Sequence, residues 1–365
     1  MGRDLWLFGG RPGALVPADR PVRLALPAAG TVRSYQWPAA CRSSHRHRSG
    51  YTRATRQRRD LLPQSSAGSL WWYGAGSMTA PSEAYWLDQL QEDGYCIIPQ
   101  LVAEQQIAAL DADLEAAFAQ APLGKGDFYG HRTKRFGSLL RRSQVAGDLV
   151  LQPLVLSLAR AILGSACDRI QLNVAQAIAI HPGEIEQFPH CDQDMWAGRK
   201  GDHEYLLNVI WPLTEFTRLN GATRIYPGTH RKPVDNLESL DDPIVAVCKP
   251  GDAICFLGST VHGAGPNQTE DVRRGVVIGY SLGWLKPYEN LWLAYPPAVA
   301  KKFSPELAEL AGYVQHRPNL GNFEGQCPSV LLSDKVPEFP QATDSLRPDQ
   351  KEAVREFAET RRSGR

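Results

Sequence analysis

The sequence predicts a mainly β fold of the jelly-roll type with flanking α-helices. Three observations lead to this prediction. Short runs of apolar and β-branched residues recur between residues 170 and 282. Turn sequences rich in Pro and Gly, such as Pro227-Gly228 and Pro250-Gly251-Asp252, separate these runs. Helical patterns are confined mostly to the chain before and after this region, so two packed antiparallel sheets are the expected architecture.

The predicted strands are short, as a jelly roll requires. The longest runs from Ile170 to Ile180 and alternates Ile170, Leu172, Val174, Gln176, Ile178 and Ile180 on one face. The others expected are Tyr95–Pro99, Tyr205–Leu213, Ala222–Tyr226, Ile244–Cys248, Ala253–Leu257 and Gly275–Leu282. Residues 124–137 are rich in Gly and basic residues and are expected to form a loop, of the kind that often serves as a lid.

Helical signals flank the strands. Ser82 can cap a helix that ends at Gly94. A second helix carries Ile107, Leu110, Leu114 and Phe118 at spacings of three and four, which gives one apolar stripe. Residues 149–163 are apolar at helical spacing. Later, a helix is predicted between Ser304 and Gly312, and a charged one over residues 349–361.

Composition divides the chain of 365 residues into three parts. Residues 1–77 contain twelve Arg, no Lys and only three acidic residues, with little periodicity. They are interpreted as a disordered extension or as sequence that precedes the native start at Met78; a basic arm for RNA or an anionic membrane is the alternative. Residues 78–335 are predicted to form the functional domain, and residues 336–365 a tail with one helix.

The remaining composition is that of a soluble protein. The seven cysteines are odd in number and form no Cys-x-x-Cys motif, which is typical of a reducing compartment, so a cytoplasmic location is expected. No run of 18 apolar residues predicts a membrane span. The domain has more acidic than basic residues, so binding to nucleic acid is not expected.

One short motif predicts a metal site. In His190-Cys191-Asp192, the only His-x-Asp or His-x-Glu in the chain, an extended backbone directs His190 and Asp192 to the same face. His262 is the best third ligand. Two histidines and one carboxylate form the facial triad of non-haem Fe(II) oxygenases, which leaves three coordination positions open.

A candidate co-substrate clamp follows His262 by eleven residues. Arg273 can bind a carboxylate through two parallel hydrogen bonds. In an extended strand Gly275, Val277 and Gly279 share its face and leave room for a bound acid, whereas Arg274 points the other way. These four residues together predict an oxygenase that depends on Fe(II) and 2-oxoglutarate.

The ordered set His190, Asp192, His262 and Arg273, with Asn267 between the last two, resembles the phytanoyl-CoA dioxygenase family of 2-oxoglutarate oxygenases. The resemblance covers roughly residues 82–335. Five further segments look like family segments: Thr133–Arg135, Asn208–Leu213, Asn220–His230, Lys249–Asp252 and Leu310–Tyr313.

The resemblance implies a fold and a set of roles. The family fold is a double-stranded β-helix, a cupin-like jelly roll. By resemblance His190, Asp192 and His262 bind Fe(II), and Arg273 pairs with the distal carboxylate of 2-oxoglutarate. Gln187 and Thr223 occupy positions that contact 2-oxoglutarate in some relatives. The implied cofactors are Fe(II), 2-oxoglutarate and O2, with ascorbate expected to stimulate turnover.

The substrate is expected to be a small organic molecule. Trp196, four residues after Asp192, and Arg135, in the basic loop, are candidates for contacting it. Hydroxylation with release of succinate and CO2 is the predicted reaction. Desaturation, epoxidation or ring formation on a natural product, or a metal-binding jelly roll without turnover, are the alternatives. The protein is expected to be a monomer or a homodimer without a membrane or nucleic-acid partner.

Overall fold

The computed structural model describes residues 81–198, 201, 203–231 and 239–363. Residues 1–77, which were predicted to be an extension, lie outside the described part of the chain. The division of the rest into a domain of residues 78–335 and a tail of residues 336–365 stays a prediction.

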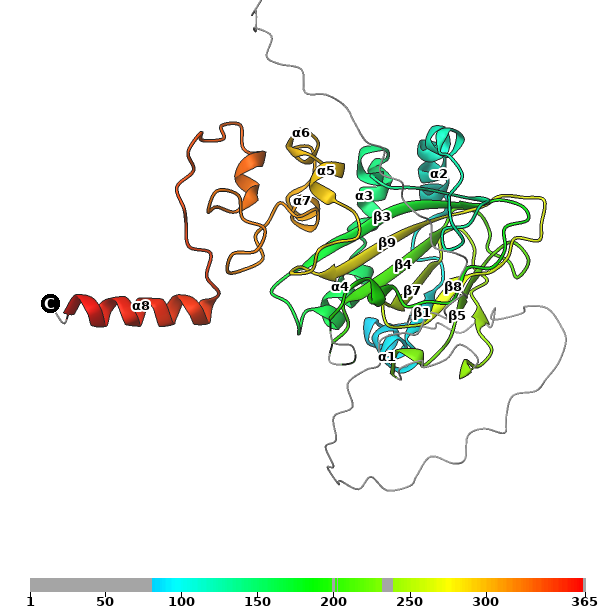
Figure 1. Cartoon of the computed structure of the whole chain (residues 1–365), viewed down its shortest axis with the longest axis horizontal. Coiled ribbons are helices and arrows are strands. Elements are labelled where there is room, and N and C mark those ends of the chain that lie inside the picture. The colour runs from blue at the N-terminus through cyan, green and yellow to red at the C-terminus, as the bar shows by residue number, and fades with distance from the viewer. Residues whose placement is uncertain (1–80, 199–200, 202, 232–238, 364–365) are drawn as a thin grey trace, which may run out of the picture. The chain divides into compact units, whose positions relative to one another are not determined.

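Two antiparallel sheets form the centre of the described chain (Figure 1). The larger sheet contains, in spatial order, β1 (Tyr95–Ile98), β7 (Ala253–Leu257), β4 (Leu206–Pro212), β9 (Arg273–Leu282), β3 (Ile170–Ile180) and β2 (Thr133–Phe136). The smaller sheet contains β6 (Ile244–Val245), β5 (Thr223–Ile225) and β8 (His262–Ala264). The prediction of a mainly β jelly roll with flanking helices is confirmed, and the sheets do not close into a barrel.

The first helices begin and end where the local sequence predicts. Helix α1 (Glu83–Asp93) starts after Ser82, whose Oγ accepts a hydrogen bond from the Tyr85 amide at 3.3 Å. It ends at Gly94, which has a φ of 81° that glycine adopts without strain. Helix α2 (Glu104–Gln120) buries Ile107, Leu110, Leu114 and Phe118, the predicted apolar stripe.

The single helix expected over residues 149–163 is two helices. Helix α3 (Gln144–Val150) ends before Leu151, and α4 (Pro153–Leu163) begins at Pro153. The ring of Pro153 disfavours a helical conformation at the residue before it, and Pro153 lacks the N–H that would continue the helix. Among the described residues no single helix is long and apolar enough to cross a membrane; only α3 and α4 together, bent by 45°, meet that criterion.

Four α-helices and one 3₁₀ helix (Pro328–Leu332) follow the last strand in the described chain. Helices α5 (Leu291–Ala294), α6 (Pro297–Ala300), α7 (Pro305–Leu310) and α8 (Pro348–Ser363) complete the described chain. Helix α7 is capped as predicted, because the Ser304 Oγ accepts from the Leu307 amide at 3.3 Å.

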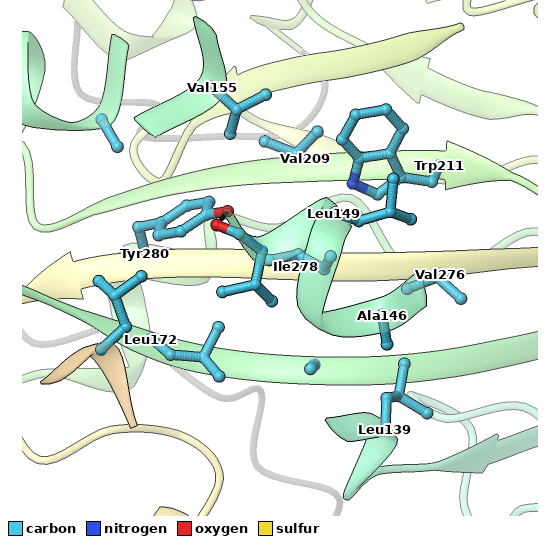
Figure 2. Close-up of a cluster of buried hydrophobic side chains, with 14 of the residues drawn as sticks. Leu139, Ala146, Leu149, Val155, Leu172, Val209, Trp211, Val276, Ile278 and Tyr280 are labelled. Atoms are coloured by element: carbon cyan, nitrogen blue, oxygen red, sulfur yellow. Dashed lines mark hydrogen bonds between the residues drawn. The ribbon is translucent and has the colours of Figure 1, made fainter. Parts of the chain in front are cut away.

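The hydrophobic core lies on one face of the large sheet, beneath α3 and α4 (Figure 2). Ala146, Leu149 and Val155 of the helices pack over strand residues that point to the same side. These strand residues include Leu172, Val209, Trp211, Val276, Ile278 and Tyr280. The Tyr280 hydroxyl donates to the Val150 carbonyl at 2.7 Å, which fastens α3 to the sheet.

The opposite face of the same strands lines a cavity. Arg273, Gly275 and Val277 of β9 face it, and so do alternate residues of β4 and β3. One irregularity changes the predicted alternation of β3: the register with β9 shifts between Leu172 and Val174. This β-bulge directs Leu172 to the core and Val174 to the cavity, so the two do not share a face as the sequence suggested.

Candidate metal centre

The backbone pairs the two candidate histidine ligands directly. His190 and His262 form an antiparallel bridge. The His190 amide donates to the His262 carbonyl at 2.9 Å, and the His262 amide donates back at 3.0 Å. Directly opposed residues in such a pair project to the same side, and the ring centroids lie 4.5 Å apart.

Asp192 joins the histidines through a short extended step. Cys191 has extended backbone angles, so His190 and Asp192 point the same way, and a 3₁₀ turn begins at Asp192. Asp192 Oδ1 lies 3.3 Å from His190 Nε2, and Oδ2 lies 3.6 Å from His262 Nε2. The three ligand atoms lie within 4.8 Å of one another. The structure therefore brings the three predicted residues into one cluster.

Both imidazole rings are held by the nitrogen that faces away from this cluster. His190 Nδ1 lies 2.8 Å from the Phe188 carbonyl, and His262 Nδ1 lies 3.1 Å from the Thr260 carbonyl. A carbonyl accepts only, so each Nδ1 carries a proton, and Nε2 is the ring nitrogen that each histidine directs toward the cluster. Hydrogen bonds of this kind fix the orientation of metal-binding histidines.

Burial and mutual proximity set the protonation of the cluster. Burial acts to raise the pKa of Asp192, but the His262 and His190 imidazoles and the Asn208 amide outweigh it and lower that pKa to about 2. Burial lowers the pKa of His262 to about 4, against the attraction of Asp192. At neutral pH both side chains are therefore in the form that binds a metal.

Asn208, which the sequence analysis did not single out, completes the surroundings of Asp192. Its Nδ2 donates to Asp192 Oδ2 at 2.7 Å from the middle of β4. One signal was present in the sequence: Asn208 interrupts an otherwise apolar run, Leu206-Leu207-Asn208-Val209-Ile210. A polar residue buried in such a strand needs a partner, but only the fold identifies that partner as Asp192.

Arg273 is a buried cation without an acidic partner among the described residues. Its side chain lies over the Phe216 ring at 3.6 Å, and its Nη2 donates to Thr223 Oγ1 at 3.4 Å. Its Nε is buried without a hydrogen-bond partner. Burial, and the nearby charge of Arg135, lower the pKa of Arg273 to about 9, which still leaves it charged at neutral pH.

Two further residues, Thr223 and Gln187, were predicted to contact 2-oxoglutarate. Thr223 and Gln187 line the same cavity as the metal cluster. The Gln187 amide also ties two segments together: its Nε2 donates to the Phe128 carbonyl at 3.2 Å, and its Oε1 accepts from the Ala264 amide at 3.4 Å.

The two candidate substrate residues differ in position. Arg135 lines the cavity; its Nη1 donates to Gln176 Oε1 at 3.4 Å, and its Nε is buried without a partner. Trp196 does not line the cavity. Its indole N–H donates to the Lys286 carbonyl at 2.9 Å, and its ring packs against the core. A role for either residue in substrate binding stays a prediction.

The cavity that contains the cluster has a volume of about 120 Å³. Aromatic side chains stand at its edge: the Phe128 ring lies 4.8 Å from the His190 ring, and the Tyr129 and Tyr288 hydroxyls are 2.9 Å apart. Phe128, Tyr129 and Tyr288 are partly exposed to solvent. They belong to the loops before β2 and after β9.

The side chains present fit a metal ion and an anionic co-substrate. Two imidazoles and one carboxylate suit Fe(II) and leave coordination positions free. A buried guanidinium without a counter-ion is costly, so Arg273 favours a ligand that brings a carboxylate into the cavity. 2-Oxoglutarate has such a group at one end and metal-binding oxygens at the other.

Comparisons with known proteins agree with this fit. The model of the phytanoyl-CoA dioxygenase (PhyH) family matches residues 90–275. Dioxygenase trt7 of Aspergillus terreus is 31% identical over 61% of this chain and 82% of its own length. Dioxygenase FrzG of a Cladobotryum species is 30% identical over 59% of this chain and 78% of its own.

Solved structures are more distantly similar. The crystal structure of the non-heme α-ketoglutarate-dependent epimerase SnoN from nogalamycin biosynthesis has a TM-score of 0.49 and 18% identity, over 58% of this chain and 88% of that one. The family match spans just over half of the chain and includes all six predicted iron and co-substrate residues. This chain therefore belongs to the phytanoyl-CoA dioxygenase family of Fe(II)- and 2-oxoglutarate-dependent oxygenases, and it is a dioxygenase of that class.

Proposed function

We propose that this dioxygenase hydroxylates a small organic molecule and converts 2-oxoglutarate to succinate and CO2. The observation that supports this most directly is the arrangement of one cavity. His190, Asp192 and His262 meet at its wall, and the guanidinium of Arg273, which has no acidic partner in the described part of the chain, lines the same space. A site that only stored a metal would not need that buried cation.

The proposed roles follow from these positions. The two Nε2 atoms and one Asp192 oxygen would hold Fe(II), which when bound supplies the redox chemistry that activates O2. Arg273, with the Thr223 hydroxyl beside it, would bind the distal carboxylate of 2-oxoglutarate through charge-assisted hydrogen bonds. Burial of Arg273 excludes water that would compete for the same donors.

The aromatic edge of the cavity supports a small-molecule substrate. The Phe128 ring lies next to His190, and the hydrogen-bonded Tyr129 and Tyr288 line the same cavity, so the three side chains offer flat apolar surfaces. We further propose that the protein is a monomer or a homodimer and that it acts in the cytoplasm. Ascorbate should stimulate its turnover.

Succinate release tests the proposal. Purified protein with Fe(II), ascorbate and 2-oxoglutarate should release succinate slowly alone and faster with a true substrate, whose product gains one oxygen atom. The variant Asp192→Ala should abolish both rates. Wild-type protein that binds metal but releases no succinate with any candidate would instead favour a binding protein.

The nature of the product decides between the proposed reaction and its alternative. Desaturation, epoxidation or ring formation uses the same cofactors and the same residues. Mass spectrometry distinguishes desaturation and ring formation, which remove two hydrogens without adding oxygen. Epoxidation of a double bond adds one oxygen atom, as hydroxylation does, so NMR of the product must show whether that oxygen is in a hydroxyl group or in an epoxide ring. Incorporation of ¹⁸O from labelled O2 into a new hydroxyl group supports hydroxylation.

A further inference from the structure

The carboxylate of Asp192 is held by a side chain that is not itself part of the metal cluster. Asn208 Nδ2 donates to Asp192 Oδ2 at 2.7 Å, which is short for an amide donor and typical of a bond to a charged acceptor. Asn208 is 1% exposed, so water does not compete for this bond. We propose that Asn208 is a positioning residue that makes Asp192 bind the metal through one oxygen only.

The two oxygens of Asp192 have different surroundings. Oδ1 lies 3.3 Å from His190 Nε2 and accepts no bond from Asn208, while Oδ2 lies 3.6 Å from His262 Nε2 and also accepts from the Asn208 amide. A donor on Oδ2 withdraws electron density from that atom and restricts rotation of the carboxylate. Oδ1 is then the better ligand. If both oxygens coordinated, Asp192 would fill a position that the co-substrate or O2 needs.

The sheet around Asn208 is built to leave room for its amide. In the strand register Asn208 lies opposite Phe256 of β7 and Gly279 of β9. A Cβ at position 279 would stand 2.9 Å from Asn208 Oδ1, closer than ordinary contacts allow. Glycine at position 279 therefore lets the amide turn toward Asp192.

Binding of Co(II) alone tests this role without a substrate. The inference rests on the metal centre of the proposed function, but not on the reaction that follows. We expect Asn208→Leu, which keeps the volume and removes the donor, to weaken Co(II) binding by about 10–100-fold. The visible absorption spectrum of bound Co(II) should also change, because the number of carboxylate oxygens on the metal changes.

A matched control comes from strand β3 of the same sheet, which is separated from β4 by β9. Asn173 is also 1% exposed and lines the same cavity, but its Oδ1 accepts from the Tyr288 amide instead of contacting Asp192. Asn173→Leu removes the same group from the same sheet. It should change thermal stability while the affinity for Co(II) and its spectrum stay those of the wild type.

A second variant keeps the test decisive if Asn208→Leu does not fold. Gly279→Ala leaves Asn208 in place and displaces its amide, and it should shift the spectrum and weaken Co(II) binding. If Asn208→Leu and Gly279→Ala are soluble and match the wild type in both Co(II) affinity and Co(II) spectrum, the proposed role of Asn208 is wrong, and the metal centre is not affected by that result. A wild-type protein that binds no Co(II) would overturn the metal centre, and the proposed function with it.

Discussion

Arg273 and Arg274 are adjacent residues of the same type with opposite environments. Arg273 points into the cavity and has no acidic partner among the described residues. Arg274 points to the other side, where its Nη1 contacts Asp111 at 3.4 Å and Glu115 at 2.5 Å, and its side chain lies over Phe118. Successive side chains along an extended strand point to opposite faces of the sheet. Because Arg274 forms its ion pairs on one face, Arg273 must point to the other face, into the cavity.

The first prediction concerns these two arginines. Arg273→Leu should raise the KM for 2-oxoglutarate about 10–150-fold, because a hydrogen bond to a charged group contributes about 1.5–3 kcal/mol. Arg274→Leu is the matched control: it removes partly exposed ion pairs and should leave that KM unchanged. Steady-state succinate kinetics measure both. Equal effects of the two variants would contradict the assignment of Arg273 as the clamp.

The sequence was sufficient to predict where a side chain points when that direction follows from the local backbone alone. His190 and Asp192 are two positions apart in an extended step, and Gly275 and Val277 share the face of Arg273. Their side chains therefore had a predictable direction. The role of Asn208 was not predictable, because its partner lies 16 residues earlier in the chain and meets it only after β4 has joined the sheet.

At the scale of elements, the sequence identified most strands and helices but not those that depend on partners. Strand β2 is made of Thr133-Lys134-Arg135-Phe136, a short polar run at the edge of the sheet, and was expected to be loop. Its strand character comes from pairing with β3. The bulge in β3 likewise arises from register with β9, which no alternation within one strand reveals.

The loop that precedes β2 is fastened to the site by one carboxylate. Glu184 is 7% exposed; its Oε2 accepts from the Arg132 amide at 2.6 Å and from the Thr133 hydroxyl at 2.9 Å. The same loop carries Phe128, whose ring lies against His190. Glu184 thus connects the position of the loop to the edge of the cavity.

The second prediction tests this connection. Glu184→Ala should lower the free energy of unfolding by about 1–3 kcal/mol, because it leaves buried donors without an acceptor. It should also speed cleavage by trypsin at Lys125 and Arg132, since the loop loses its anchor. Denaturant unfolding and timed proteolysis measure the two effects.

A surface carboxylate provides the comparison for Glu184. Glu306 forms an exposed ion pair with Arg160 at 2.8 Å. Glu306→Ala should cost no more than about 1 kcal/mol and leave the loop cleavage unchanged. If the two variants unfolded and were cleaved alike, Glu184 would not be the anchor of the loop.

At the scale of the whole molecule, the metal cluster joins segments that are distant in sequence. His190 and Asp192 lie between β3 and β4, whereas His262 begins β8. The unfolded chain cannot keep these three groups together, so the metal binds the folded state far better. The buried charge of Arg273 opposes folding until an anion neutralises it. Metal and co-substrate should therefore both stabilise the protein.

Thermal unfolding with and without metal tests this coupling. Relative to protein treated with EDTA, Co(II) at about 100 times its Kd should add about 2.7 kcal/mol to the free energy of unfolding and raise the Tm by about 5 °C or more. 2-Oxoglutarate should raise the Tm further only when metal is present, because it binds the metal and Arg273 together. His262→Ala should lose both increases. A Co(II)-induced increase of the same size in His262→Ala would mean that the stabilising metal binds elsewhere in the chain.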